Sequence, residues 1–178
     1  MAYLDEASFN YQPFVRRTWA ERGKTPSIAH GPLWGGVQAI SLVTDTGRIY
    51  FKLKTGAFTG SDVVDFLAGV LRRYRRYGLL VILDGVRMHH SRAVQDFIAA
   101  HRQRIHLEYL PAYCPQLNAD EQVHGFIKQY RMANRLLTQP QELWQAVQTA
   151  YGELARRPDL GRAFLRHPDV AYYQTSAA

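Results

Sequence analysis

The sequence predicts an α/β fold in which a mixed five-stranded sheet carries helices on both faces. First, Leu79–Leu83 is a run of large aliphatic residues that ends at Asp84, which is typical of a strand buried on both faces. Second, a turn separates the apolar stretches 37–43 and 48–53, which indicates a β-hairpin. Third, strand and amphipathic helix patterns alternate after residue 60.

The first half of the chain is expected to contain three strands and one helix. Residues 3–9 are a candidate strand, and residues 10–32, rich in Pro, Gly and Arg, predict an extended excursion or a hairpin. After the 37–53 hairpin, a helix is expected to begin at Gly60 or Ser61 and to end at Gly78. One apolar stripe at helical spacing supports this helix: Val63, Val64, Phe66, Leu67, Val70, Leu71 and Tyr74. Four arginines are predicted in its last turn: Arg72, Arg73, Arg75 and Arg76.

The second half of the chain repeats strand and helix. The buried strand 79–83 precedes a helix with Ser91 as its N-cap, a strand at 105–110 and a helix from about residue 118. Pro140 introduces the last long helix. This is the element order of a ribonuclease-H-like fold, in which the first strand and the strand after the first helix lie side by side at the centre of the sheet. Asp5 and Asp84 are therefore expected to be neighbours.

Composition limits the class of protein. The chain has 178 residues, which fits one domain spanning 1–178. Its formal charge of +7 favours a polyanionic partner such as nucleic acid, although a basic protein without such a partner is the alternative. Cys114 is the only cysteine, which excludes an intrachain disulfide and a thiolate zinc cage. The sequence shows no signal peptide and no apolar run of the roughly 20 residues that span a bilayer, so a cytoplasmic protein with no membrane partner is expected.

Two carboxylates are placed where chemistry is expected. Asp84 follows the buried strand, and ligands in open α/β sheets bind outside the carboxyl ends of strands. Glu121 lies near the start of an amphipathic helix. Carboxylates delivered to one sheet edge suggest a divalent-metal site. The alternatives are that Asp84 caps the next helix and that Glu121 is a first-turn acid favoured by the helix dipole.

Three stretches resemble one protein family. Tyr113–Glu121 (YCPQLNADE) is similar to the family signature Tyr-Ser-Pro-(acidic or polar)-Leu-Asn-Pro-Ile-Glu. Leu83–Ser91 (LDGVRMHHS) is similar to Leu-Asp-Asn-Ala-x-x-His-His-Ser. Leu4–Phe9 and Arg17–Pro26 resemble an Asp-Glu-x-x-Phe strand followed by Arg-Thr-Trp-Ala-x-x-Gly. The chain thus resembles the catalytic domain of mariner-like bacterial insertion-sequence transposases, which belong to the DDE superfamily of endonucleases.

The resemblance implies a catalytic, metal-binding triad of Asp5, Asp84 and Glu121, with Glu6 as an adjacent rival to Asp5. Clustered carboxylates repel one another, which raises their pKa values until cations neutralise them. The implied cofactor is a pair of Mg²⁺ ions, with Mn²⁺ as a substitute. The implied reactions are DNA cleavage at the element ends and strand transfer to target DNA.

The chain departs from the family pattern at several positions. Gly85 replaces the Asn after the second Asp, and Cys114 replaces Ser. Ala119-Asp120 replaces Pro-Ile, and His124 stands where Trp is common. None of these changes removes a carboxylate of the triad. Asp120 is expected either to perturb the site with its extra charge or to face solvent.

Basic and polar residues near these motifs are candidate contacts to nucleic acid. They are Arg17, Arg22, Lys24, Arg87, His89, Asn118, Lys128 and Arg131. The cations around Trp19 suit phosphate contact plus base stacking, whereas the alternative is a solvated hairpin with Trp19 packed inward. The adjacent histidines His89 and His90 point apart on an extended loop, so joint zinc ligation is not expected. Loop packing is the alternative role for this pair.

Length raises further alternatives. Members of the family carry an N-terminal helix-turn-helix region that recognises element ends, and here Met1 lies just before Asp5, so this region is expected to be absent and the first strand to be clipped. The chain is then the second frame of a split transposase beside a separate helix-turn-helix frame, or an inactive remnant that binds DNA nonspecifically or dimerises. Expected partners are DNA at the nucleoid and, as in other transposases, a second copy. A host nuclease of the same fold that cuts RNA–DNA hybrids is another alternative; a hydrolase using Ser91 or Cys114 lacks a nucleophile elbow.

Overall fold

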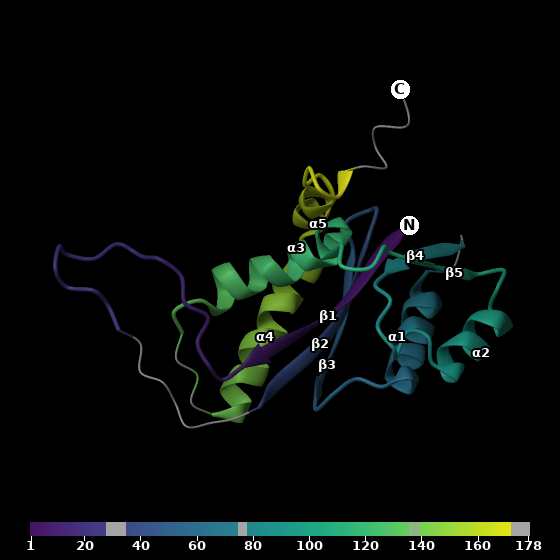
Figure 1. Ribbon diagram of the computed structural model, residues 1–178, viewed down its shortest axis with the longest axis horizontal. Coiled ribbons are helices and arrows are strands. Elements are labelled where there is room, and N and C mark those ends of the chain that lie inside the picture. The colour runs from purple at the N-terminus through teal and green to yellow at the C-terminus, as the bar shows by residue number, and fades with distance from the viewer. Residues whose placement is uncertain (28–34, 75–77, 136, 138, 172–178) are drawn as a thin grey trace.

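The sheet has five strands in the order β3-β2-β1-β4-β5. The computed structural model describes residues 1–27, 35–74, 78–135, 137 and 139–171 (Figure 1). The strands are β1 (Ala2–Asn10), β2 (Gly36–Thr44), β3 (Ile49–Thr55), β4 (Leu79–Leu83) and β5 (Ile105–Tyr109). The predicted strands are all present, and the mixed sheet is confirmed because β1, β2 and β3 are antiparallel whereas β4 and β5 run parallel to β1.

Strand β1 is the centre of the sheet. All nine of its residues pair with β2, from Ala2 opposite Thr44 to Asn10 opposite Gly36. On its other side it pairs with β4, with Tyr3 opposite Ile82. The expected adjacency of β1 and β4 is confirmed. Strand β1 is paired with β2 along its whole length.

Helices cover both faces of the sheet (Figure 1). The helices α1 (Gly60–Arg73) and α2 (Arg92–Ala100) pack on one face, and α3 (Ala119–Phe126), α4 (Pro140–Ala155) and α5 (Pro158–Leu165) pack on the other. Each face has its own apolar core. The α1 face buries Leu4, Leu42, Val63, Leu67, Val81 and Val94, and the α4 face buries Tyr3, Phe9, Val43, Val123, Leu143 and Tyr151.

The alternation of β1 decides which acids face which helices. Odd-numbered residues such as Tyr3 and Phe9 pack against α3, α4 and α5, whereas Leu4 packs toward α1 and α2. Asp5 therefore lies on the face that carries Glu121, and Glu6 lies on the opposite face. Because side chains alternate between the two faces of a strand, Asp5 and not Glu6 is the neighbour of Glu121.

The ends of two helices differ from expectation. Helix α1 is capped by Thr59, whose side chain accepts a hydrogen bond from the backbone N–H of Asp62, and it ends at Arg73 rather than at Gly78. Arg75 and Arg76 lie outside the described residues. Helix α3 continues into a π-helical segment, η2 (Ile127–Met132). Among the described residues, no helix combines the length and the apolarity that crossing a bilayer requires.

Residues 11–27 form an arm without helix or strand, and it extends away from the sheet (Figure 1). Its base is fixed by Asn134, whose side chain accepts from the Arg16 N–H at 3.0 Å and donates to the Arg16 carbonyl at 3.0 Å. Trp19, further along, is 99% exposed. Inward packing of Trp19 is therefore wrong, and of the 10–32 excursion, residues 28–32 lie outside the described part.

Candidate active site

Asp5, Asp84 and Glu121 line one pocket of about 400 Å³, which lies where β4 ends beside β1. Continuing the parallel register from Tyr3 and Ile82 by two residues places Asp5 beside Asp84. Glu121 reaches the same pocket from the first turn of α3. The rest of the lining is mostly apolar: Gly85, Val86, Leu110, Pro111, Ala112, Tyr113, Cys114, Pro115 and Asn118.

Asp5 is the buried member of the three carboxylates. It is only 7% exposed, and its Oδ2 has no hydrogen-bond partner among the described residues. Burial, followed by the nearby charges of Glu121 and Asp120, raises the pKa of Asp5 to about 9. A carboxyl group with this pKa holds its proton at neutral pH in the absence of a cation.

Asn118 fixes the position of Glu121. Its side chain accepts a hydrogen bond from the Asp120 N–H at 3.1 Å and so caps α3, and its amide donates to the Leu4 carbonyl at 2.9 Å. This second bond ties the start of α3 to β1 next to Asp5. Asn118 is 2% exposed, so its predicted contact with nucleic acid does not fit the structure: the side chain is used inside the protein.

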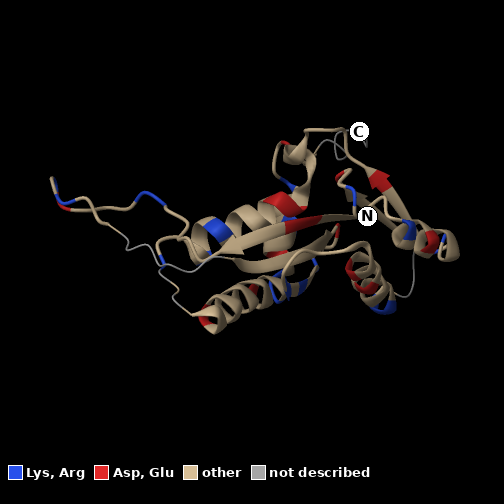
Figure 2. Cartoon of the chain, turned by 60° about the horizontal axis from the view of Figure 1, so that its bottom comes forward, with Lys and Arg blue, Asp and Glu red and all other residues tan. Residues whose placement is uncertain are grey.

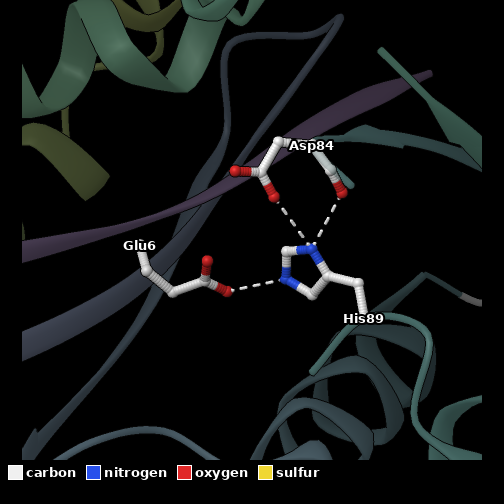
Figure 3. Close-up of side chains that lie close together, drawn as sticks. All are labelled: Glu6, Asp84 and His89. Carbon is white, nitrogen blue, oxygen red and sulfur yellow. Dashed lines mark hydrogen bonds and ion pairs between the residues drawn. The ribbon is translucent and has the colours of Figure 1, made fainter. Parts of the chain in front are cut away.

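His89 connects Asp84 to Glu6 (Figure 3). Its Nε2 lies 3.0 Å from Glu6 Oε1, and its Nδ1 lies 3.1 Å from Asp84 Oδ1 and 3.0 Å from the Asp84 carbonyl oxygen. Burial alone would lower the pKa of His89, but the carboxylates of Asp84 and Glu6 outweigh it and raise the pKa to about 10. The direct nucleic-acid contact predicted for His89 does not fit, because the side chain is fully buried; loop packing, the alternative role, describes it.

The Glu6–Asp84–His89 cluster holds three potential metal ligands within 4.8 Å of one another. Both imidazole nitrogens face carboxylate or carbonyl oxygens, so both are placed to donate hydrogen bonds. That requirement is met by an imidazolium ion. The hydrogen bond from His89 also lowers the pKa of Asp84, which keeps this carboxylate ionised. The cluster is therefore best described as a protonated histidine between two carboxylates.

A second polar layer lies behind Asp5, inside the core. Asp120 is fully buried and its Oδ2 accepts a hydrogen bond from Ser41 Oγ at 2.6 Å. His124 is 1% exposed, and its Nδ1 lies 2.7 Å from the Tyr151 hydroxyl. Burial raises the pKa of Asp120 and lowers that of His124 to about 3. The expectation that Asp120 faces solvent is wrong. A neutral His124 forms no ion pair with Asp5 or Asp120, and its hydrogen bond is the one with Tyr151.

The other predicted nucleic-acid residues have different surroundings. Arg17, Arg22 and Arg87 are exposed, and Lys24 is exposed and pairs with Glu21 at 2.7 Å. Lys128 lies over the rings of Phe9 and Phe14, and Arg131 pairs with Glu153 at 3.1 Å. Figure 2 shows Lys and Arg along the outer part of the arm.

The sequence matches one known protein family over most of its length. The family described as DDE superfamily endonuclease matches residues 1–143. None of the curated proteins compared with the chain by sequence gives a significant match.

Solved structures of Mos1 mariner transposase are similar in fold. The Mos1 catalytic domain matches with a TM-score of 0.58 and 14% identity, covering 91% of this chain and 80% of that one. The Mos1 paired end complex with Mn gives 0.64 and 14%, and the Mos1 strand transfer complex gives 0.63 and 15%. Each of these covers 91% of this chain but only 54% and 53% of the other, so the chain spans about half the length of those Mos1 chains. The likeness confirms the ribonuclease-H-like fold, and because the family match covers most of the sequence, the chain belongs to the DDE superfamily endonuclease family.

Proposed function

We propose that this domain cuts DNA phosphodiester bonds and transfers the cut strand to new DNA, as the catalytic part of an insertion-sequence transposase. One observation carries the proposal: three carboxylates from β1, the end of β4 and α3 line one pocket. Family membership supports the endonuclease chemistry. Solved Mos1 relatives described as a paired end complex and a strand transfer complex support the extension to transposition.

The residues present fit a pair of Mg²⁺ or Mn²⁺ ions. Asp5, Asp84 and Glu121 offer hard oxygen ligands, and the buried Asp5 Oδ2 lacks a partner. Relatives of the same fold are described as complexes with Mn and with Mg. When bound between carboxylates of this kind, two such ions activate the attacking oxygen and stabilise the leaving oxygen.

The protein itself supplies position and orientation. His89 and the Val86 N–H, at 3.3 Å, hold one oxygen of Asp84, and the other oxygen points away from His89 (Figure 3). Asn118 holds the start of α3 against β1. Carboxylates that are held in place in this way can bind a shared cation with little free-energy cost for reorganising their side chains.

Exposed cations are the proposed contacts to the DNA backbone. Arg87 lies three residues after Asp84, and its side chain is exposed. Arg17, Arg22 and Lys24 lie on the arm together with the exposed Trp19. Phosphate contact by cations combined with base stacking on an aromatic ring is a general mode of nucleic-acid binding.

Metal-dependent nicking of plasmid DNA tests the proposal. The purified chain is incubated with supercoiled plasmid in Mg²⁺, Mn²⁺, Ca²⁺ or EDTA, and nicked circles are counted over time. Nicking in Mg²⁺ and Mn²⁺ but not in EDTA is expected, because all three pocket acids require cations. Salt-sensitive DNA binding without nicking under any metal would instead support an inactive remnant. Cutting restricted to RNA–DNA hybrids would support a host nuclease.

Metal binding is expected to strengthen with pH. The pKa of Asp5 is raised from 3.8 to about 9, so between these values the folded, metal-free protein holds a proton that the unfolded chain has lost. The free energy of unfolding of the metal-free protein therefore falls as pH rises through this window, and metal binding must release the proton. The apparent affinity for Mn²⁺, measured by calorimetry at pH 6, 7 and 8, is expected to rise up to about tenfold per pH unit. An affinity independent of pH contradicts this.

A further inference from the structure

We propose that His124 is a positioning residue for Asp5: held by Tyr151, its Nε2–H orients the buried Oδ2 of the Asp5 carboxylate once a cation occupies the pocket. This inference rests on the proposed metal-binding role of Asp5. It assigns a function to the polar cluster of Ser41, Asp120, His124 and Tyr151, which does not line the pocket and which the chemistry above does not use.

Unpaired buried atoms point to this cluster. In the described part of the chain, four buried side-chain polar atoms lack a hydrogen-bond partner, and three of them are Asp5 Oδ2, Asp120 Oδ1 and His124 Nε2. A buried polar atom without a partner destabilises the folded protein, because it has lost its hydrogen bonds to water. Three in one place are a feature that a purely structural core would be expected to avoid.

The distances show how the cluster could become satisfied. His124 Nε2 lies 3.8 Å from Asp5 Oδ2 and 3.6 Å from Asp120 Oδ2, just beyond hydrogen-bond distance in both cases. A side-chain movement of about 1 Å would bring His124 and Asp5 to the 2.7–2.9 Å of a charge-assisted hydrogen bond. A small movement of either side chain is therefore enough to form a hydrogen bond between His124 Nε2 and Asp5 Oδ2.

The contact with Tyr151 determines which nitrogen of His124 can donate a hydrogen bond to Asp5. A carboxylate bound to a cation is ionised and only accepts hydrogen bonds, so Nε2 must carry the proton. Nδ1 is then the acceptor of the Tyr151 O–H at 2.7 Å. Tyr151 is fully buried on α4 and stacks on Phe51 at 5.0 Å between ring centroids, so its hydroxyl is held in place. This is the arrangement by which outer residues orient ligands at metal sites.

Two departures from the family pattern meet in this cluster. Asp120 and His124 stand where Ile and Trp are usual, and the structure places them in contact one helical turn apart. Ser41 on β2 donates a hydrogen bond to the oxygen of Asp120 that lies 3.6 Å from His124 Nε2, so this oxygen already has one partner. The two polar substitutions thus form one unit directly behind a pocket carboxylate.

Binding of Mn²⁺, measured by electron paramagnetic resonance of the free ion at one pH, tests the proposal without relying on cleavage. His124→Phe keeps the ring but loses the donor, and it is expected to weaken Mn²⁺ binding about 10–100-fold. His124→Gln restores an N–H donor and is expected to recover most of that loss. His106→Phe, the same change at an exposed position on β5, is the matched control and should bind as the wild type does.

Nuclear magnetic resonance of the His124 side chain tests the same role in the wild-type protein. The variant His124→Phe serves here only to assign the resonance. In protein labelled with ¹⁵N-histidine, saturation with Mg²⁺ is expected to shift the Nε2 resonance that disappears in His124→Phe. If the wild type binds Mn²⁺ but His124→Phe binds it equally well, or if this resonance does not move, the positioning role is wrong while the proposed function stands. If the wild type binds no Mn²⁺, both fall together.

Discussion

Replacing Glu121 by Gln is expected to abolish metal-dependent nicking while the protein stays folded. The substitution keeps the size of the side chain and removes one of the charges that hold cations in the pocket. Loss of a metal-binding charge removes several kcal/mol of transition-state stabilisation, which corresponds to a rate loss of about 10³-fold or more. The measurement is the initial rate of plasmid nicking in Mg²⁺, with nonspecific DNA binding followed in parallel and expected to be unchanged.

The same substitution has an opposite effect on stability. Glu121 is one of the charges that raise the pKa of Asp5, so its removal relieves repulsion in the metal-free protein. The melting temperature in EDTA is expected to stay equal or to rise, and the increase that Mn²⁺ causes in the wild type should disappear. Glu108→Gln, on the exposed edge strand β5, is the matched control for both measurements. Nicking by Glu121→Gln at the rate of Glu108→Gln would remove Glu121 from the mechanism.

The main elements of the fold could be predicted because they depend on local patterns and on one topological rule. The aliphatic run Leu79–Leu83 admits few structures other than a buried strand, and it is β4. The element order of a ribonuclease-H-like fold is the rule that places this strand beside β1. The pairing of Tyr3 with Ile82 confirms the placement and brings Asp5 and Asp84 together. The arm and the π-helical segment η2 were harder to predict because no periodic pattern specifies them.

The second layer of the site was missed although part of its signal was present. Asp120 and His124 share a stripe with Val123 and Ile127 at spacings of three and four residues, which marks the inward face of α3. This spacing predicts that Asp120 is buried, although its charge alone favours an exposed position. Its partners Ser41 and Tyr151 come from distant elements, and no local pattern in the sequence specifies such contacts.

Replacing His89 by Ala is expected to lower the free energy of unfolding by about 2–4 kcal/mol in EDTA. Breaking a buried ion pair by removing one partner costs about 3–5 kcal/mol, and the cost is smaller here because Asp84 remains partly exposed. His90→Ala is the matched control on the next residue. His90 is exposed and stacks on Tyr109, so its loss should cost only about 1 kcal/mol. Urea denaturation of the two variants and the wild type gives the comparison, and equal losses would contradict the bridging role of His89.

The difference between wild type and His89→Ala should also depend on pH, with a sign that identifies the imidazolium ion. The pKa of His89 is raised from 6.5 to about 10, so the folded protein keeps a proton that the unfolded chain releases above pH 6.5. The stabilisation by His89 is therefore fully present below about pH 6.5 and is lost as pH rises toward 10. The titration of Asp5 also lowers stability over this range, but it is common to both proteins and cancels in the difference. A difference that stays constant from pH 6 to pH 10 would mean that His89 is neutral, and Glu6 and Asp84 would then need another source of positive charge.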